Sequence, residues 1–541
     1  MLLDGRKVSR GRTIECDVCI VGAGAAGITL AHELHGRPER VLLLESGGFK
    51  ASKAAQDLNA GAVSDPAHHG PLDGYRVRRF GGTSTVWGGW CAPFDGIDFQ
   101  ARAHVPHSGW PIDKAELDPF YARAHAYCEL GAYAYDASSA LAGAPAPAIP
   151  GLASPEVVTD QLWLVSPPTN FGSSYRLVLR RSRNVTVCLH ANALKLLAGP
   201  PGRVDQVAVG CVDGNRFSVR ARAFVLAAGG LETTRLLLLS DDVHRGGIGN
   251  GRDLVGRFYL SHLSGDVGEV ELRPRGGQVV WGYQTTVDGV YCRRRLGIDQ
   301  TRQQADRLLN FAAILDRPLP DDPSHGDGLL SAIFLAKLVR GRESRASRRE
   351  VAAHLANVLT DAGSVARSSA VWVRRRLLAA RRLPSVLPNQ TGNRYTLHFD
   401  AEQAPNPDSR VLLGDQLDPF GLRRLRVDWR FSEADVDSVV RSTQTIEAAL
   451  RQAGIGRLLL DLKDRRDRVR ELASVGSHHL GTTRMADDPA RGVVDATCRV
   501  HGMGNLWIAS SSVFATSSYA RPTLTIVALA IRLADHLKRS L

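Results

Sequence analysis

The chain has 541 residues, enough for two domains, and 44% of them are hydrophobic, which is ample for a large core. No run of about 18 or more apolar residues occurs, so the sequence contains no predicted membrane-spanning helix. The net charge of +13 would suit a nucleic-acid partner, but most of the excess lies in one window and no nucleic-acid-binding motif accompanies it. We therefore expect no nucleic-acid binding.

The first predicted element is a buried strand at residues 16–21 that leads into a glycine-rich turn and a helix. Gly22 allows a tight turn, Gly24 lets backbone N–H groups approach a pyrophosphate, and Gly27 lets the helix pack on the strand. A second apolar strand ends in Glu45, 18 residues after Gly27, where an acidic residue holds the ribose hydroxyls of a dinucleotide. A turn that binds no ligand would leave Glu45 unexplained. The predicted dinucleotide contacts are Gly22, Gly24, Ala25, Ala26, Gly27 and Glu45.

Later segments add further strands and turns rich in small residues. Residues 79–89 form a second glycine-rich turn, and residues 223–230 form a buried strand that leads into a helix. Residues 478–485 carry two adjacent histidines before a Gly-Thr pair, and residues 505–509 form another buried strand. A last helix opens at Pro522, because the fixed φ of proline suits the first helical position.

Together these segments resemble the glucose–methanol–choline (GMC) flavoprotein oxidoreductases over most of the chain. The nearest branch is that of the bacterial sugar and polyol oxidoreductases and the pyranose oxidases, which residues 108–112, 166–172 and 402–407 also resemble. The resemblance implies that the dinucleotide is FAD. In pyranose oxidases a histidine bonds covalently to the flavin, but Val86 stands at that position here, so we expect non-covalent FAD. The further cofactor contacts that the resemblance implies are Gly81, Gly82, Thr83, Ser84, Ser511 and Thr523.

The interleaved segments predict an α/β fold with two discontinuous domains. A Rossmann-like FAD-binding domain comprises residues 1–110, 151–262 and 470–541. An α+β substrate-binding domain comprises residues 111–150 and 263–469. Its sheet is predicted to be mainly antiparallel, since short alternating runs there are typical of strands. Residues 331–385 form a predicted basic helical insert.

The predicted base is a histidine. Oxidising an alcohol at a flavin removes a hydride from carbon and a proton from oxygen, so a base with a pKa near neutrality is needed. In the family the catalytic histidine stands three residues before the glycine of the Gly-Thr pair, which selects His478. His479 faces the other way if the segment is extended. The alternative is a hydrogen-bonded structural pair, and we expect His262 to be structural.

Arg521 departs from the family pattern, which places asparagine or histidine before the proline. Arginine cannot act as a base, because its guanidinium stays protonated. It can bind a carboxylate or phosphate, or stabilise an alkoxide and an anionic flavin. Alternatively, Arg521 turns away into an ion pair. The resemblance also implies that the helix at Pro522 directs its N-terminus, including Thr523, at the flavin pyrimidine edge.

The predicted function is therefore FAD-dependent oxidation of a CH–OH group in a sugar, polyol or related hydroxy compound, anionic compounds included. The hydride goes to flavin N5, His478 is the base, and Arg521 and His479 are the other catalytic candidates. A flavin-dependent lyase or other non-oxidative enzyme on the same scaffold is the alternative. An FAD-binding protein without turnover is disfavoured by the intact His478. Oxygen, a quinone and a carrier protein remain open as electron acceptors.

Most of the positive charge lies in residues 331–385, which contain twelve basic and three acidic residues at amphipathic helical spacing. This insert either contacts an anionic membrane surface or a partner, or is a helical cap whose arginines face water, and the cap is favoured. The eight cysteines show no disulfide or metal-ligand spacing, and the N-terminus lacks the order of a signal peptide. We expect no metal and a cytoplasmic protein, membrane-peripheral if the insert contacts lipid.

Overall fold

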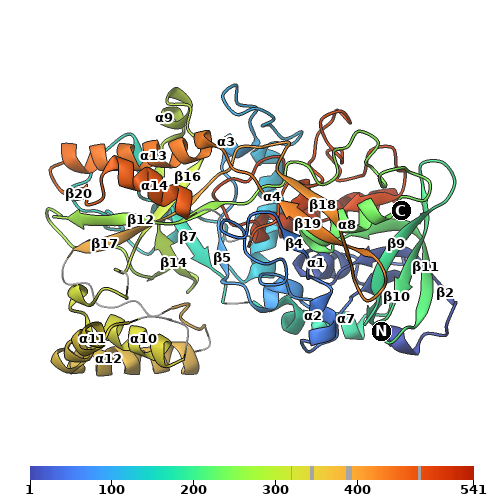
Figure 1. Cartoon of the computed structure of the whole chain (residues 1–541), viewed down its shortest axis with the longest axis horizontal. Coiled ribbons are helices and arrows are strands. Elements are labelled where there is room, and N and C mark those ends of the chain that lie inside the picture. The colour runs from blue at the N-terminus through green and yellow to red at the C-terminus, as the bar shows by residue number, and fades with distance from the viewer. Residues whose placement is uncertain (168, 319, 341–345, 380, 386–392, 473–476) are drawn as a thin grey trace.

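The structure is a computed structural model that describes residues 1–167, 169–318, 320–340, 346–379, 381–385, 393–472 and 477–541. The molecule is elongated (Figure 1). One lobe surrounds a largely parallel sheet and holds both chain termini, and the other surrounds an antiparallel sheet. A layer of three helices lies beside the second lobe.

The first sheet has eight strands: β1 (Leu2–Asp4), β2 (Thr13–Val21), β3 (Val41–Leu44), β8 (Val185–Leu189), β9 (Asn192–Ala198), β10 (Val204–Gly210), β11 (Arg216–Leu226) and β21 (Leu506–Ile508). Their order is β1-β8-β3-β2-β11-β10-β9, with β21 paired to β11. β10 pairs antiparallel with both β9 and β11, whereas the other pairs are parallel. Val21 is in register with both Leu44 and Leu226, so the carboxyl ends of β2, β3 and β11 meet at one edge. Ligands of doubly wound sheets bind at such an edge.

Four helices pack around this sheet: α1 (Ala25–Glu33), α4 (Lys114–Cys128), α8 (Gly229–Leu239) and α15 (Thr523–Ser540). The buried face of α15 includes Leu524, Val527 and Ile531, at helical spacing. It packs on α1 and α4. The start of α15 is thereby fixed beside the turn that precedes α1.

The second lobe contains a six-stranded sheet of β6 (Val157–Val158), β12 (Leu263–Leu272), β15 (Leu296–Ile298), β16 (Phe311–Asp316), β17 (Arg394–Ala401) and β20 (Gly456–Leu458). Its order is β20-β12-β17-β16-β15-β6, and every neighbouring pair is antiparallel. The long helices α13 (Glu433–Gln452) and α14 (Leu462–Glu471) lie against it (Figure 1). The predicted α/β class and the mainly antiparallel second sheet are confirmed.

Two smaller sheets complete the body. One contains β5 (Trp90–Cys91), β7 (Leu162–Val165), β13 (Gln284–Thr285) and β14 (Tyr291–Arg294), and the other contains β4 (Ala62–Val63), β18 (Arg410–Leu417) and β19 (Arg423–Asp428). β6 and β7 belong to the segment assigned above to the FAD-binding domain, yet they pair with strands of the second. The exact domain division therefore stays a prediction.

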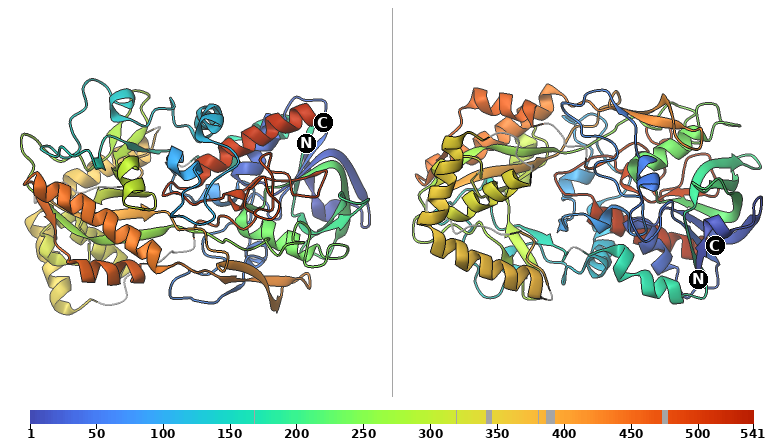
Figure 2. Two further views of the ribbon diagram at one scale, coloured as in Figure 1. Left: turned by 90° about the horizontal axis from the view of Figure 1, so that it is seen from above. Right: turned by 60° about the horizontal axis from the view of Figure 1, so that its bottom comes forward.

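The helical insert consists of α10 (Gly328–Val339), α11 (Arg348–Thr360) and α12 (Ala362–Trp372), followed by a π-helical turn (Val373–Leu378). α10 packs on both α11 and α12. His354 is buried and stacks on Phe334 with ring centroids 4.1 Å apart. The three helices lie together beside the second lobe, on the side of the molecule away from the two termini (Figure 2). Arg342, Glu343 and Arg345, counted above in the basic window, lie outside the described residues.

Short elements fill the connections. All eight cysteines are buried and none forms a disulfide. Among the described residues, no helix is both long and apolar enough to cross a membrane. The remaining short helices are α2 (Lys53–Asp57), α3 (Gly96–Phe99), α5 (Ala137–Ala140), α6 (Phe171–Ser174), α7 (Arg176–Arg181), α9 (Gln300–Ala305) and the 3-10 turns Gly5–Lys7, Gly82–Thr85, Pro323–His325 and Ser511–Val513.

Candidate active site

A cavity of about 680 Å³ lies at the carboxyl edge of the parallel sheet. It extends from the turn after β2 to the histidine pair and the start of α15, which are almost five hundred residues apart in the chain. Gly27 and Gly81 are the two predicted site residues that do not line it. The predicted residues that do are Gly22, Gly24, Ala25, Ala26, Glu45, Gly82, Thr83, Ser84, His478, His479, Ser511, Arg521 and Thr523.

The glycines of the first turn differ in what surrounds them. Gly22 has φ +105°, and a Cβ on it would lie 2.6 Å from the Ala227 carbonyl oxygen. A Cβ on Gly27 would lie 1.9 Å from the Gly22 carbonyl oxygen, so Gly27 serves close packing. A Cβ on Gly24 would meet no described atom within 4 Å, which leaves this backbone open to the cavity. No side chain caps the start of α1, so its first N–H groups and its dipole favour an anion there.

Glu45 supports the same turn. Its Oε2 accepts a hydrogen bond from the Ala23 backbone N–H at 3.0 Å, and its Oε1 accepts one from the Gly47 N–H at 2.8 Å. The residue is 5% exposed and lines the cavity. It therefore fixes the turn while its carboxylate remains at the cavity wall.

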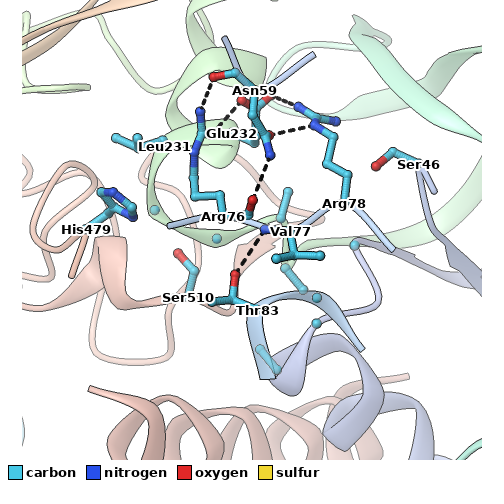
Figure 3. A pocket seen from close by; sticks show the side chains of 18 of the residues that line it. Ser46, Asn59, Arg76, Val77, Arg78, Thr83, Leu231, Glu232, His479 and Ser510 are labelled. Carbon is cyan, nitrogen blue, oxygen red and sulfur yellow. Dashed lines mark hydrogen bonds and ion pairs between the residues drawn. The ribbon is translucent and has the colours of Figure 1, made fainter. Parts of the chain in front are cut away.

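Residues 74–78 form part of the cavity wall and are held by an ion-pair cluster (Figure 3). Glu232, in the first turn of α8, pairs with Arg76 at 2.8 Å and with Arg78 at 2.6 Å. Arg76 also donates to the Asn59 carbonyl oxygen, and Arg78 to the Asn59 side chain, each at 2.7 Å. Burial opposes ionisation of Glu232, but the guanidinium groups of Arg78 and Arg76 outweigh it and hold the pKa of that carboxyl well below its ordinary value.

His478 lies at the other end of the cavity and contacts His262, which immediately precedes β12. The two Nδ1 atoms are 2.7 Å apart, and the rings are inclined at 77°. The Nε2 of His262 lies 3.1 Å from the Ser517 carbonyl oxygen. Burial lowers the pKa of His478 well below its ordinary value, the neighbouring His262 and the guanidinium of Arg521 lower it further, and Asp400 opposes them. His478 is therefore neutral near pH 7.

His479 also lines the cavity but has different neighbours. Its ring stacks on Tyr259, with centroids 6.2 Å apart and planes at 15°. Its carbonyl oxygen accepts a hydrogen bond from Ser511 Oγ at 2.6 Å. A Cβ on Gly230 would lie 2.3 Å from that carbonyl, so the small residue at the start of α8 admits the histidine segment.

Arg521 faces the cavity and is also ion-paired. Its Nη2 lies 3.3 Å from Asp400 Oδ2, and its guanidinium lies 5.5 Å from the Trp90 ring centroid and 5.9 Å from that of Trp163. Asp400 also accepts a hydrogen bond from Ser264 Oγ at 2.7 Å. Burial opposes ionisation of Asp400, but Arg521 and neighbouring histidines hold its pKa well below the ordinary value. Arg521 therefore lines the cavity and forms an ion pair at the same time, and its role in catalysis stays a prediction.

The loop before α15 is buried and held from outside the cavity. Ser518 has φ +55°, which is uncommon for a residue with a side chain. Its Oγ donates to Asp98 Oδ2 at 2.7 Å. Burial and the nearby Glu402 raise the pKa of Asp98 to about 8. Pro522 caps α15 without a side-chain bond, so the N–H groups of its first turn are open at the cavity.

Two models of known protein families match this chain. The family model described as "FAD dependent oxidoreductase" matches residues 17–299, more than half of the chain, and the model described as "GMC oxidoreductase" matches residues 405–530. The chain belongs to the GMC oxidoreductase family. It is an FAD-dependent enzyme.

Relatives of this GMC oxidoreductase span nearly its whole length. It is 26% identical to 6'''-hydroxyparomomycin C oxidase of Streptomyces lividus, over 96% of this chain and 92% of the relative. It is 25% identical to paromamine 6'-oxidase of Streptomyces fradiae, over 96% and 90%. The crystal structure of pyridoxine 4-oxidase from Mesorbium loti has the same fold, with a TM-score of 0.54 and 18% identity over 97% of this chain and 99% of that one.

The cavity of the GMC oxidoreductase fits FAD. The uncapped start of α1 and the open backbone at Gly24 suit a pyrophosphate, and Glu45 suits a ribose. The uncapped start of α15 suits an electron-rich ring. When bound, FAD supplies the hydride acceptor.

Sequence reasoning missed three parts of the site. His262, expected to be structural, contacts His478; Asp400 pairs with Arg521; and the cluster around Glu232 holds the cavity wall. None has a local motif. The nearest signal was the position of His262 directly before a strand that reaches the second lobe.

Proposed function

We propose that this enzyme oxidises a CH–OH group of a neutral sugar, polyol or related hydroxy compound, with His478 as base. The observation that carries this proposal is the neutral, half-buried histidine beside the open start of α15, at the far end of the cavity from the dinucleotide turn. His478 would take the hydroxyl proton and bound FAD would supply the hydride acceptor, so that the substrate C–O bond becomes a carbonyl. His479 lies on the same wall.

The charge balance favours a neutral substrate. Asp400 is ionised and lies 3.3 Å from Arg521, so the guanidinium does not present an uncompensated positive charge. Its remaining N–H groups are suited to hydrogen bonds with a hydroxyl or a developing alkoxide. Trp90 also lines the cavity and offers an apolar surface for a ring. The two Streptomyces relatives are named as oxidases of 6'''-hydroxyparomomycin C and of paromamine, which supports oxidation as the reaction.

The test is anaerobic reduction of the purified holoenzyme by a panel of neutral sugars, sugar acids, glycosides and aliphatic alcohols. The flavin band should bleach with at least one neutral sugar or polyol. A preference for sugar acids that disappears in Arg521→Asn would contradict neutrality. Cleavage of a hydroxy compound without bleaching would instead support a lyase.

The rate at which the reduced flavin is reoxidised distinguishes the three candidate electron acceptors. The reduced enzyme is mixed with oxygen, with a soluble quinone or with an oxidised carrier protein, and the return of the flavin band is timed.

Val86 lines the cavity in place of a histidine, so we propose that FAD is held without a covalent bond. Acid precipitation should release all of it.

In place of the water-facing cap that the sequence favoured, we also propose that the helical insert contacts an anionic lipid surface. Leu359 is 78% exposed and Leu378 is 76% exposed, and both stand among exposed arginines such as Arg367, Arg374 and Arg375. Apolar side chains mixed with arginine on surface helices suit the headgroup region of an anionic bilayer. A second copy of the chain is a poor partner for this surface, because the two positively charged inserts would repel each other. The buried, unpaired cysteines suit the cytoplasmic side.

Sedimentation with vesicles tests this contact. The protein should pellet with vesicles rich in phosphatidylglycerol and not with phosphatidylcholine alone. The double variant Arg374→Glu with Arg375→Glu should stay in the supernatant. The control, Arg245→Glu with Arg252→Glu, changes exposed arginines on another part of the chain and should pellet like the native protein. Equal sedimentation of both double variants would contradict the proposal.

A further inference from the structure

His262 is placed between a backbone carbonyl and the proposed base. Its Nε2 lies 3.1 Å from the Ser517 carbonyl oxygen, and its Nδ1 lies 2.7 Å from His478 Nδ1. The residue is 2% exposed. Both of its ring nitrogens are therefore occupied by protein groups, and water does not compete for them.

The carbonyl decides where the proton of His262 lies. A carbonyl oxygen can only accept a hydrogen bond, so His262 Nε2 must carry the hydrogen. In a neutral imidazole the other nitrogen, Nδ1, then holds a lone pair. A contact of 2.7 Å between two nitrogens needs one hydrogen between them, and His478 Nδ1 must supply it. The one ring nitrogen of His478 left for a substrate is Nε2, and it carries a lone pair.

The neutral state of His262 has electrostatic support. The charged groups that act on it are Asp400 and Glu402, which favour the imidazolium, and Arg521, which disfavours it. Burial is the largest effect and lowers the pKa of His262 below its ordinary value. If His262 were an imidazolium, it would donate to His478 Nδ1, and the hydrogen of His478 would move to Nε2, where it would block proton transfer.

We infer that His262 is a positioning residue that fixes His478 as the Nδ1–H tautomer and so exposes its Nε2 lone pair to the substrate hydroxyl. This inference rests on the proposal that His478 is the base. When the hydroxyl proton arrives at Nε2, His478 becomes an imidazolium whose Nδ1–H still points at the His262 lone pair. The relay Ser517–His262–His478 thus orients the ring before proton transfer and stabilises its charge afterwards.

Two substitutions separate tautomer control from simple packing. In His262→Gln the amide oxygen can accept from His478 Nδ1–H while the amide nitrogen donates to the Ser517 carbonyl. In His262→Leu both contacts are lost at similar volume. His354→Leu is the matched control, because His354 is also buried and both of its ring nitrogens also contact protein groups, the Ser331 hydroxyl at 3.1 Å and the Asp321 carbonyl at 3.3 Å.

The first measurement is the ¹⁵N spectrum of histidine-labelled, FAD-loaded, substrate-free enzyme, with the His478 signals assigned by their loss in His478→Asn. The native enzyme and His262→Gln should show a protonated Nδ1 and a bare Nε2 at His478. In His262→Leu the two nitrogens should average or exchange roles. A native spectrum with the hydrogen on Nε2 would overturn the inference, whatever the activity.

The second measurement is the rate of anaerobic flavin reduction across pH. His262→Leu should lower the limiting rate at least about 10-fold with little change in KM, because general-base catalysis is worth about 10² to 10⁴-fold. His262→Gln should recover most of that loss, and His354→Leu should match the native rate. An equal loss in the Gln and Leu variants would overturn tautomer control. If His478→Asn itself reduces flavin at the native rate, the proposed base is wrong while the spectrum still tests the tautomer.

Discussion

Arg521 Nη2 lies 3.3 Å from Asp400 Oδ2, so the positive charge at the substrate end of the cavity has a buried counter-charge. The pair joins the loop before α15 to strand β17 of the antiparallel sheet. It sets the field at His478 from two sides, since Arg521 lowers the pKa of that histidine and Asp400 raises it.

Asp400→Asn should move the acid limb of the kcat/KM profile to lower pH. The base must be neutral to work, and loss of the carboxylate lowers the pKa of His478 further, so the active form persists to more acid pH. Small anions should also inhibit about fivefold more strongly, since the uncompensated Arg521 gains on the order of 1 kcal/mol for them. An acid limb that moves to higher pH would contradict this field.

Arg521→Met should move the same limb in the opposite direction. Removing the guanidinium raises the pKa of His478, so the acid limb moves to higher pH. Arg521→Lys keeps the charge and should leave the limb closer to that of the native enzyme. The profile of kcat/KM for one neutral substrate checks both variants, and identical shifts in Met and Lys would show that the charge is not the cause.

His478→Gln should slow anaerobic flavin reduction by about 10² to 10⁴-fold, the usual worth of a general base. His479→Gln should slow it by less than about 10-fold, because His479 stacks on Tyr259 and its carbonyl contact with Ser511 is a backbone feature. Stopped-flow absorbance with saturating substrate gives both rates. A larger loss in His479→Gln than in His478→Gln would make His479 the base in place of His478.

Gly24→Ala and Gly27→Ala should fail in different ways. Alanine at Gly27 would place a Cβ 1.9 Å from a backbone oxygen, so the apoprotein should lose about 1–3 kcal/mol of unfolding free energy. Alanine at Gly24 meets no described atom within 4 Å, so the apoprotein should unfold normally while the FAD dissociation constant rises. Gly96→Ala, also in open space, is the control for both. Urea unfolding of apoprotein and FAD titration separate the two effects.

Glu232→Gln should destabilise the cavity wall in a pH-dependent way. The folded pKa of Glu232 is depressed, so its contribution is present above the ordinary pKa near 4.5 and is lost as the pH falls. At pH 7 the variant should lose about 3 kcal/mol, because Arg76 and Arg78 lose a buried partner. The difference from native should be constant above about pH 5 and should shrink only as the pH falls below about 4. Asp408→Asn, at an exposed pair, should show no such trend.

Local features of the fold were predictable from the sequence. The strand, turn and helix around Gly22, the acidic end of β3 at Glu45 and the helix after Pro522 depend on residues within about one turn or strand of each other. The antiparallel sheet was predictable from the alternation in residues 394–399. Neighbouring residues determine the local backbone conformation, the local hydrogen bonds and the spacing of buried side chains. Such patterns can therefore be identified in the sequence without knowledge of the fold.

Contacts between distant segments were not predictable in this way. His262 and His478 are 216 residues apart, and Arg521 and Asp400 are 121 apart. Nothing near Asp400 marks it as the counter-charge of an arginine in another segment. The sheet order brings β12 and β17 side by side, and that pairing places His262 against His478 and Asp400 against Arg521.

By itself the sequence determined the family, the dinucleotide end of the cavity and the histidine pair, because each is recorded in contiguous residues. Only the tertiary structure decided the state of the reactive end. There, burial and the fields of residues far away in the chain set the charge and tautomer of His478 and compensate Arg521, and these effects depend on distance in space rather than in sequence.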